Sequence, residues 1–223
     1  MLRKIALWAL WLGFVVYAFG FSPPQQPDTF TLIQNLSTGN WQGINPLVIA
    51  LFNIMGVLPM LYSCFLYSDG RMQKIPAWLF GAASFGVGAF ALLPYLALRE
   101  ANPTFTGSKN LWLKIWDSRI TGGVVALGAI ALLLYGVTQG DWRDFVAQWQ
   151  TSRFIHVMSL DFCCLCLLFP TLLGDDMARR GLTDRRLFWL VSLIPLLGTL
   201  AYVVLRPPLQ EASDRVGDAV LQS

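Results

Sequence analysis

Residues 93–99 read Leu-Pro-Tyr-Leu-Ala-Leu-Arg, and residues 200–206 read Leu-Ala-Tyr-Val-Val-Leu-Arg. Both segments fit the pattern Leu-x-Tyr-x-x-Leu-Arg, and they are displaced by 107 positions. At the same displacement Asp69 meets Asp176, and one position further off Asn53 meets Asp161. Self-similarity at a fixed spacing indicates a duplicated unit. We therefore expect a chain of two diverged halves.

The composition predicts the surroundings of these halves. The chain has 223 residues, of which 55% are hydrophobic and only 13% are charged, whereas a soluble domain is about 25% charged. This indicates an integral, multi-pass membrane protein whose first partner is the lipid bilayer. It argues against a large catalytic domain outside the membrane. The net charge of +3, without a basic face, argues against a nucleic-acid partner.

Six apolar segments have the length that crosses a bilayer as a helix. They are residues 5–21, 47–67, 77–98, 120–138, 154–173 and 187–205. Asn45-Pro46 is a suitable start for the second of them. The expected fold is all-α, a polytopic membrane protein with six transmembrane helices. We divide it into a three-helix half at 1–106, a three-helix half at 107–208 and a polar tail at 209–223.

A three-helix unit crosses the membrane an odd number of times, so its tandem copy would enter the other way up. The sequence thus predicts a 3+3 inverted-topology repeat, an arrangement that many transporters use. With six spans, the Lys and Arg residues divide eight against eight between the two faces. The positive-inside rule therefore leaves the orientation open.

The half that ends with Leu93, Pro94, Arg99 and Glu100 resembles a bacterial family of small three-helix membrane domains of unknown function. The family has an Asp in its second helix, and Asp161 looks like that residue. Asn53 departs from it in the first half, and Pro207 replaces the final Glu in the second.

The whole chain also resembles uncharacterised membrane proteins of cyanobacteria and plastids, over about residues 1–206. The residues that carry this resemblance are Asn45-Pro46, residues 68–71 (Ser-Asp-Gly-Arg) and residues 75–78 (Ile-Pro-Ala-Trp). The resemblance implies a thylakoid or plasma membrane, and it implies no activity.

Four residues are candidates for an intramembrane polar site: Asp161, Asn53, Ser159 and His156. A carboxylate within a span costs about 2.5–3.5 kcal/mol on insertion scales, so Asp161 should face the interior of the bundle. It could form a proton or cation site, or a structural hydrogen bond to Asn53, Ser159 or a neighbouring helix. His156 is the only histidine. It could bind a pigment, although packing is the simpler interpretation, and no metal or other cofactor is predicted.

Four arginines lie between the fifth and sixth segments: Arg179, Arg180, Arg185 and Arg186. Together with nearby aspartates they could contact anionic lipid headgroups or a partner subunit. The alternative is a solvated loop that fixes the topology.

No catalytic constellation is evident, which favours a non-enzymatic protein. We expect an accessory or assembly component of a membrane complex, and the resemblance suggests a photosynthetic one. A small transporter or channel with a midplane site at Asp161 and Asn53 is the alternative. A membrane enzyme acting on a lipid or an isoprenoid is the third possibility.

Overall fold

The computed structural model describes residues 1–209, which form helices and loops and contain no strand. The helices up to residue 98 are α1 (Leu2–Gly20), α2 (Thr29–Thr38), α3 (Pro46–Asp69), the single-turn η1 (Gly70–Met72), α4 (Ala77–Val87) and α5 (Ala89–Leu98). The later helices are α6 (Leu111–Trp116), α7 (Arg119–Gln139), α8 (Trp142–Thr151), α9 (Arg153–Leu168), α10 (Pro170–Arg179), α11 (Arg185–Leu193) and α12 (Leu197–Leu205). Except for Leu209, the expected polar tail lies outside the described residues.

Within residues 1–209, four helical segments are long and apolar enough to cross a membrane. They are Leu2–Gly20, Pro46–Met72, Arg119–Gln139 and Arg153–Arg179, the last formed by α9 and α10. The start of α3 is as predicted, because the Asn45 side chain accepts a hydrogen bond from the Leu47 amide and Pro46 occupies the first turn. An asparagine cap followed by proline satisfies the geometry of a helix start.

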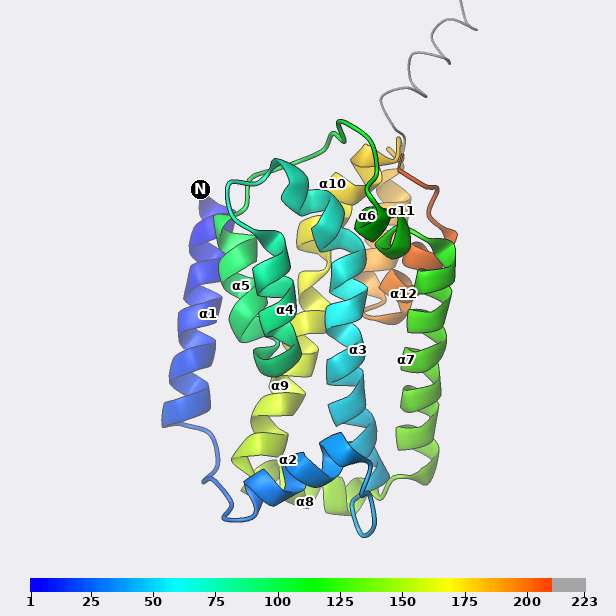
Figure 1. Cartoon of the computed structure of the whole chain (residues 1–223). Coiled ribbons are helices and arrows are strands. Elements are labelled where there is room, and N and C mark those ends of the chain that lie inside the picture. The colour runs from blue at the N-terminus through cyan, green and yellow to red at the C-terminus, as the bar shows by residue number, and fades with distance from the viewer. Residues whose placement is uncertain (210–223) are drawn as a thin grey trace, which may run out of the picture.

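The third and sixth expected spans are corrected by the structure. Residues 77–98 form the first hairpin, α4 and α5, and residues 185–205 form the second hairpin, α11 and α12. Gly88 breaks the first at φ +52°, and Leu196, after Pro195, breaks the second at φ 63°. Positive φ cannot continue a right-handed helix. Each hairpin therefore turns back on itself, and neither forms one long helix (Figure 1).

The expected inverted topology is also corrected. Each half runs in the same order and direction: a long helix descends, a short helix lies across the lower end, a long helix rises and a hairpin follows (Figure 1). The C-terminal ends of α3, α5, α10 and α12 thus lie at one end of the bundle. An inverted repeat would place the equivalent ends at opposite faces.

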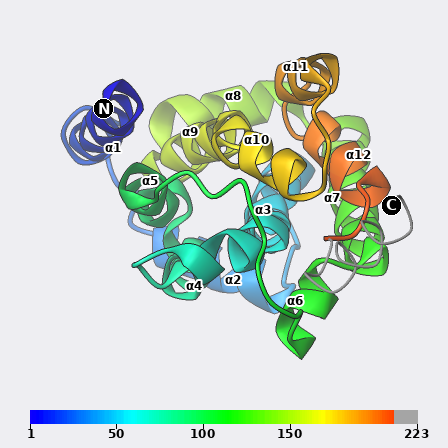
Figure 2. The same cartoon turned by 90° about the horizontal axis from the view of Figure 1, so that it is seen from above.

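The two halves pack closely, as the view along the bundle shows (Figure 2). A Cβ added at Gly136 of α7 would come within 2.7 Å of Ala50 Cβ on α3. A Cβ at Gly122 would come within 2.8 Å of a Val203 methyl carbon on α12. Small residues at such positions let helix backbones approach each other. The expected boundary at 106/107 falls in the loop between α5 and α6.

Candidate functional site

A group of buried ion pairs lies where the C-terminal ends of α3, α5, α10 and α12 meet. We call it the charged cluster, and its members are Asp69, Arg99, Asp117, Asp175, Asp176, Arg179, Arg180 and Arg206. It contains four carboxylates and four guanidinium groups, and the Lys109 ammonium lies 3.3 Å from Asp117 at its edge. We call the end of the bundle that contains the charged cluster the cluster end.

The first half contributes a triad to the cluster. Asp69 Oδ2 accepts a hydrogen bond from Tyr95 Oη at 2.6 Å and from Arg99 Nε at 2.8 Å, and Arg99 Nη2 lies 2.5 Å from Asp69 Oδ1. The side chains of Asp69 and Arg99 are fully buried. Such two-pronged arginine–carboxylate pairs are strong and directional.

The second half contributes an equivalent triad. Asp176 Oδ2 accepts a hydrogen bond from Tyr202 Oη at 2.8 Å and from Arg206 Nη1 at 3.1 Å. Each member stands 107 positions after its counterpart in the first triad. The Leu-x-Tyr-x-x-Leu-Arg pattern therefore has a physical reason: its Tyr and Arg hold the aspartate at the end of the preceding long helix.

Two further arginines connect the triads. Arg179 Nη1 lies 3.3 Å from Asp69 Oδ1, its Nη2 lies 3.6 Å from Asp176 Oδ1, and it also donates to the Asn102 carbonyl at 2.6 Å. Arg180 pairs with Asp176 at 2.8 Å and with Asp117 at 2.7 Å. The cluster is thus one continuous network across both halves.

The surroundings keep two of these arginines charged. Burial lowers the pKa of the Arg99 guanidinium, but the hydrogen bond and the charge of Asp69 outweigh burial, so this pKa is raised above its usual value. The pKa of Arg180 is raised in the same way, since the charge of Asp176 outweighs burial. Removing one partner of a buried ion pair costs about 3–5 kcal/mol.

These contacts correct, for two of the four arginines, the expectation of a contact with lipid headgroups or a partner subunit. Arg179 and Arg180 are 0% and 3% exposed and have partners inside the protein. Arg185 and Arg186 are exposed at the start of α11, so for them a headgroup contact stays a prediction. The sequence showed Asp69 and Asp176 as equivalent positions but gave no sign that both would meet Arg179.

Asp161 has a defined structural partner. Its Oδ1 accepts a hydrogen bond from the Ala89 amide at 2.7 Å, at the start of α5. Helix starts leave amide hydrogens without partners, and the break at Gly88 exposes one in the interior. The lack of a side chain at Gly88 is required, because a Cβ there would lie 1.9 Å from Asp161 Oδ2.

Asp161 also lines a cavity of about 640 Å³. The cavity lies beneath the tip of the first hairpin, and α1, α2, α3 and α9 contribute to its wall. Most of its lining is apolar, and its polar side chains are Gln25, Thr29, Ser84, Arg153 and Asp161. Within residues 1–209 the only hydrogen bond to Asp161 is the one that Oδ1 accepts, so Oδ2 has no partner there.

The other predicted polar residues do not join Asp161. Asn53 Nδ2 donates to the Ile49 carbonyl at 2.8 Å, and Ser159 Oγ donates to the Ile155 carbonyl at 2.7 Å. Both hydrogen bonds stay within the residue's own helix. Neither Asn53 nor Ser159 lines the cavity.

Both ring nitrogens of His156 are occupied. Nδ1 lies 2.9 Å from the Trp149 carbonyl, and Nε2 lies 2.9 Å from Tyr17 Oη. A carbonyl only accepts, so Nδ1 carries the proton and Nε2 accepts from the tyrosine. The ring also stacks on Trp149, with 4.3 Å between centroids. These contacts support a packing role for His156.

Over residues 1–209 the chain is all-helical, with four long apolar helical segments, a charged cluster at one end and a cavity at Asp161. Comparison with family models, curated proteins and solved structures gives no match for this chain.

Proposed function

We propose that this protein is a multi-pass membrane protein that holds a lipid-like molecule in the Asp161 cavity. The occupant would have an apolar body and a hydrogen-bond donor such as a hydroxyl group. The observation that carries this proposal is the placement of Asp161, which caps α5 through Oδ1 and also lines an otherwise largely apolar cavity. An apolar pocket with a few polar groups is the usual form of a small-molecule site.

The proposed membrane arrangement has four spans and two re-entrant hairpins, in two halves of the same orientation. Irregular backbone within a membrane is tolerated only where protein or a cavity satisfies it. Asp161 supplies that partner at the first break. At the second break the chain supplies its own, because the Gly198 amide donates to the Ile194 carbonyl at 2.8 Å. Parallel repeats of this kind occur in known transporters.

This arrangement also removes the tie in positive charge. Among residues 1–209, only Arg143 and Arg153 lie at the α2–α8 end. The cluster end holds thirteen: Arg3, Lys4, Arg71, Lys74, Arg99, Lys109, Lys114, Arg119, Arg179, Arg180, Arg185, Arg186 and Arg206. The positive-inside rule then places the cluster end and the N-terminus on the cytoplasmic or stromal side. The particular membrane, thylakoid or plasma, stays a prediction.

Asp161→Asn tests the proposed binding. The amide oxygen of Asn can still accept from the Ala89 amide, but its nitrogen is a donor and replaces Oδ2, the acceptor proposed to bind the occupant. Ser159→Ala is the control, because that hydroxyl bonds only within its own helix. We would measure binding of a long-chain primary alcohol and of its methyl ether, which lacks the donor, to the purified protein in nanodiscs.

The wild type should prefer the alcohol about tenfold, the worth of one good hydrogen bond. Asp161→Asn should lose this preference and Ser159→Ala should keep it. Equal binding of alcohol and ether by the wild type, or an unchanged preference in Asp161→Asn, would overturn the proposal.

The accessory role in a larger complex is proposed alongside this binding function. A non-enzymatic subunit that carries a bound lipid would use the cavity without chemistry. Mild solubilisation followed by native separation tests it: the chain should migrate with other subunits. Migration only as a free monomer or dimer would contradict the role.

The broken helices favour a small transporter as the second candidate, since such breaks form many transport sites. Asn53 does not line the cavity, so the site would rest on Asp161 alone. Proton-coupled flux of a small solute into proteoliposomes, abolished by Asp161→Asn, would favour transport over simple binding.

A further inference from the structure

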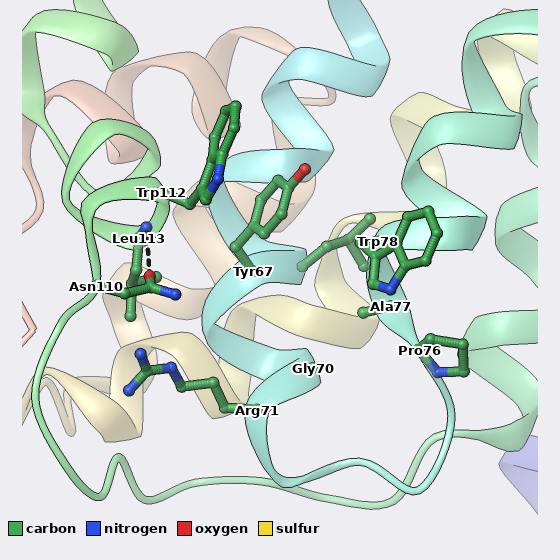
Figure 3. Close-up of a pocket in the computed structure, with 10 residues that line it drawn as sticks. Tyr67, Gly70, Arg71, Pro76, Ala77, Trp78, Asn110, Trp112 and Leu113 are labelled. Atoms are coloured by element: carbon green, nitrogen blue, oxygen red, sulfur yellow. Dashed lines mark hydrogen bonds between the residues drawn. The ribbon is translucent and has the colours of Figure 1, made fainter.

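We propose that a groove between α4 and α6 at the cluster end binds the headgroup of an anionic phospholipid. The groove has a volume of about 440 Å³, and its lining includes Tyr67, Arg71, Ala77, Trp78, Asn110 and Trp112 (Figure 3). It is separate from the Asp161 cavity, with which it shares no lining residue. The leaflet from which the lipid comes rests on the proposed orientation, whereas the binding itself does not.

Arg71 and Asn110 supply donors at one side of the groove. Arg71 Nη1 donates to the Ser108 carbonyl at 2.5 Å, and its guanidinium lies over the Phe105 ring at 5.5 Å, so the side chain is held in place. Asn110 Oδ1 accepts from the Leu113 amide at 3.0 Å, which leaves the Asn110 amide nitrogen as a donor. Figure 3 shows the Arg71 guanidinium turned toward Asn110. A fixed guanidinium beside an amide donor suits a phosphate.

Two exposed tryptophans flank these donors. Trp78 and Trp112 are 61% and 63% exposed and stand on either side of the groove, with Tyr67 between them (Figure 3). Tryptophans are enriched at the level of lipid headgroups, where the ring packs on the glycerol and upper chain. Buried Ala77 and Leu113 line the groove below them. The groove therefore offers donors to a headgroup and an apolar surface to the chain attached to it.

The charge of the cluster end selects an anionic lipid. Lys74 and Lys114 are exposed near the groove, on the adjoining loop and on α6. Each basic residue near an anionic leaflet contributes about 1 kcal/mol of attraction. A zwitterionic headgroup would gain less, because its own ammonium group would face these cations.

Native mass spectrometry of the detergent-purified full chain, titrated with phosphatidylglycerol and phosphatidylcholine, tests the proposal. The quantity measured is the ratio of the two constants for binding the first lipid. Arg71→Gln should lower the preference for phosphatidylglycerol about tenfold, the worth of a charge-assisted hydrogen bond. Lys74→Gln, the matched control, removes a neighbouring charge that does not line the groove, and should lower the preference at most about threefold. Arg71→Lys keeps the charge and should retain most of it.

An unchanged preference in Arg71→Gln would overturn the proposal. Equal losses in Arg71→Gln and Lys74→Gln would also overturn it, because they would reveal diffuse attraction without a site. The preference of the wild type for the alcohol over its ether, which tests the Asp161 cavity, is a separate measurement. A failure of the lipid proposal is therefore distinguishable from a failure of the proposed function.

Discussion

Asp69 and Asp176, 107 positions apart in the chain, lie at the same end of the molecule and share one arginine. Arg179 reaches Asp69 at 3.3 Å and Asp176 at 3.6 Å, and each aspartate is held by its own tyrosine and arginine. The two copies of the sequence pattern thus supply the tyrosine and arginine of two triads that meet. For them to meet, the C-terminal ends of α3, α5, α10 and α12 must lie at the same end of the bundle, as they do in Figure 1.

The two triads should contribute about equally to the free energy of unfolding. Asp69→Asn and Asp176→Asn each remove one carboxylate from the buried network, and each should lower the free energy of unfolding by about 3–5 kcal/mol. Glu100→Gln is the control, since Glu100 is exposed and the bond it makes to Gln73 in the loop uses backbone atoms. Thermal or denaturant unfolding in detergent micelles measures the change. A shift in the aspartate variants no larger than in the control would contradict the structural role of the triads.

Arg179, which bridges the two triads, should contribute more to stability than an exposed arginine nearby. Arg179→Gln breaks contacts to both halves and should destabilise the protein by several kcal/mol. Arg186→Gln, an exposed position near the start of α11, should change stability by less than about 0.5 kcal/mol. The same unfolding assay compares them. If the two variants were alike, Arg179 would not join the halves.

The first hairpin contains two glycines that differ in their surroundings and in their backbone conformation. A Cβ at Gly88 would lie 1.9 Å from Asp161 Oδ2 at a positive φ, whereas a Cβ at Gly86 meets nothing within 4 Å. Gly88→Ala should displace Asp161 from the Ala89 amide, lowering both stability and binding in the cavity. Gly86→Ala should be close to neutral for stability, and it is the control for that measurement alone because Gly86 lines the cavity. Unfolding midpoints and alcohol binding measure both, and a neutral Gly88→Ala would mean that the hairpin is not capped by Asp161.

The long helices could be predicted from local sequence, whereas the two hairpins could not. The start of α3 follows from Asn45-Pro46, and the four long helices follow from apolar length. Apolar length alone predicts a span at each hairpin, because an apolar stretch of about 20 residues has the same length whether it crosses or turns back. Glycine and proline are common in membrane helices, so Gly88 and Pro195 did not mark the breaks.

The candidate site could also be predicted only in part. Asp161 stood out because a carboxylate among apolar residues is costly, but its partner, the Ala89 amide, exists only where α5 begins. The eight-against-eight division of charge came from counting the hairpins as crossings. With them as hairpins, the loops at 70–76 and 99–110 lie at one end of the bundle, and the charge bias appears.

The side of the membrane on which these two loops lie tests the central claim most directly. Lys74→Cys and Thr104→Cys place thiols at exposed positions of the two loops, for labelling with a membrane-impermeant maleimide in intact and in permeabilised cells. Gln150→Cys, on α8, reports the opposite face. Two halves of the same orientation predict that Lys74→Cys and Thr104→Cys label under the same condition and Gln150→Cys under the other. With the proposed orientation in a plasma membrane, the two loop variants label only after permeabilisation and Gln150→Cys labels in intact cells. Labelling of Lys74→Cys and Thr104→Cys from opposite sides would show that residues 77–98 cross the membrane and would contradict the account.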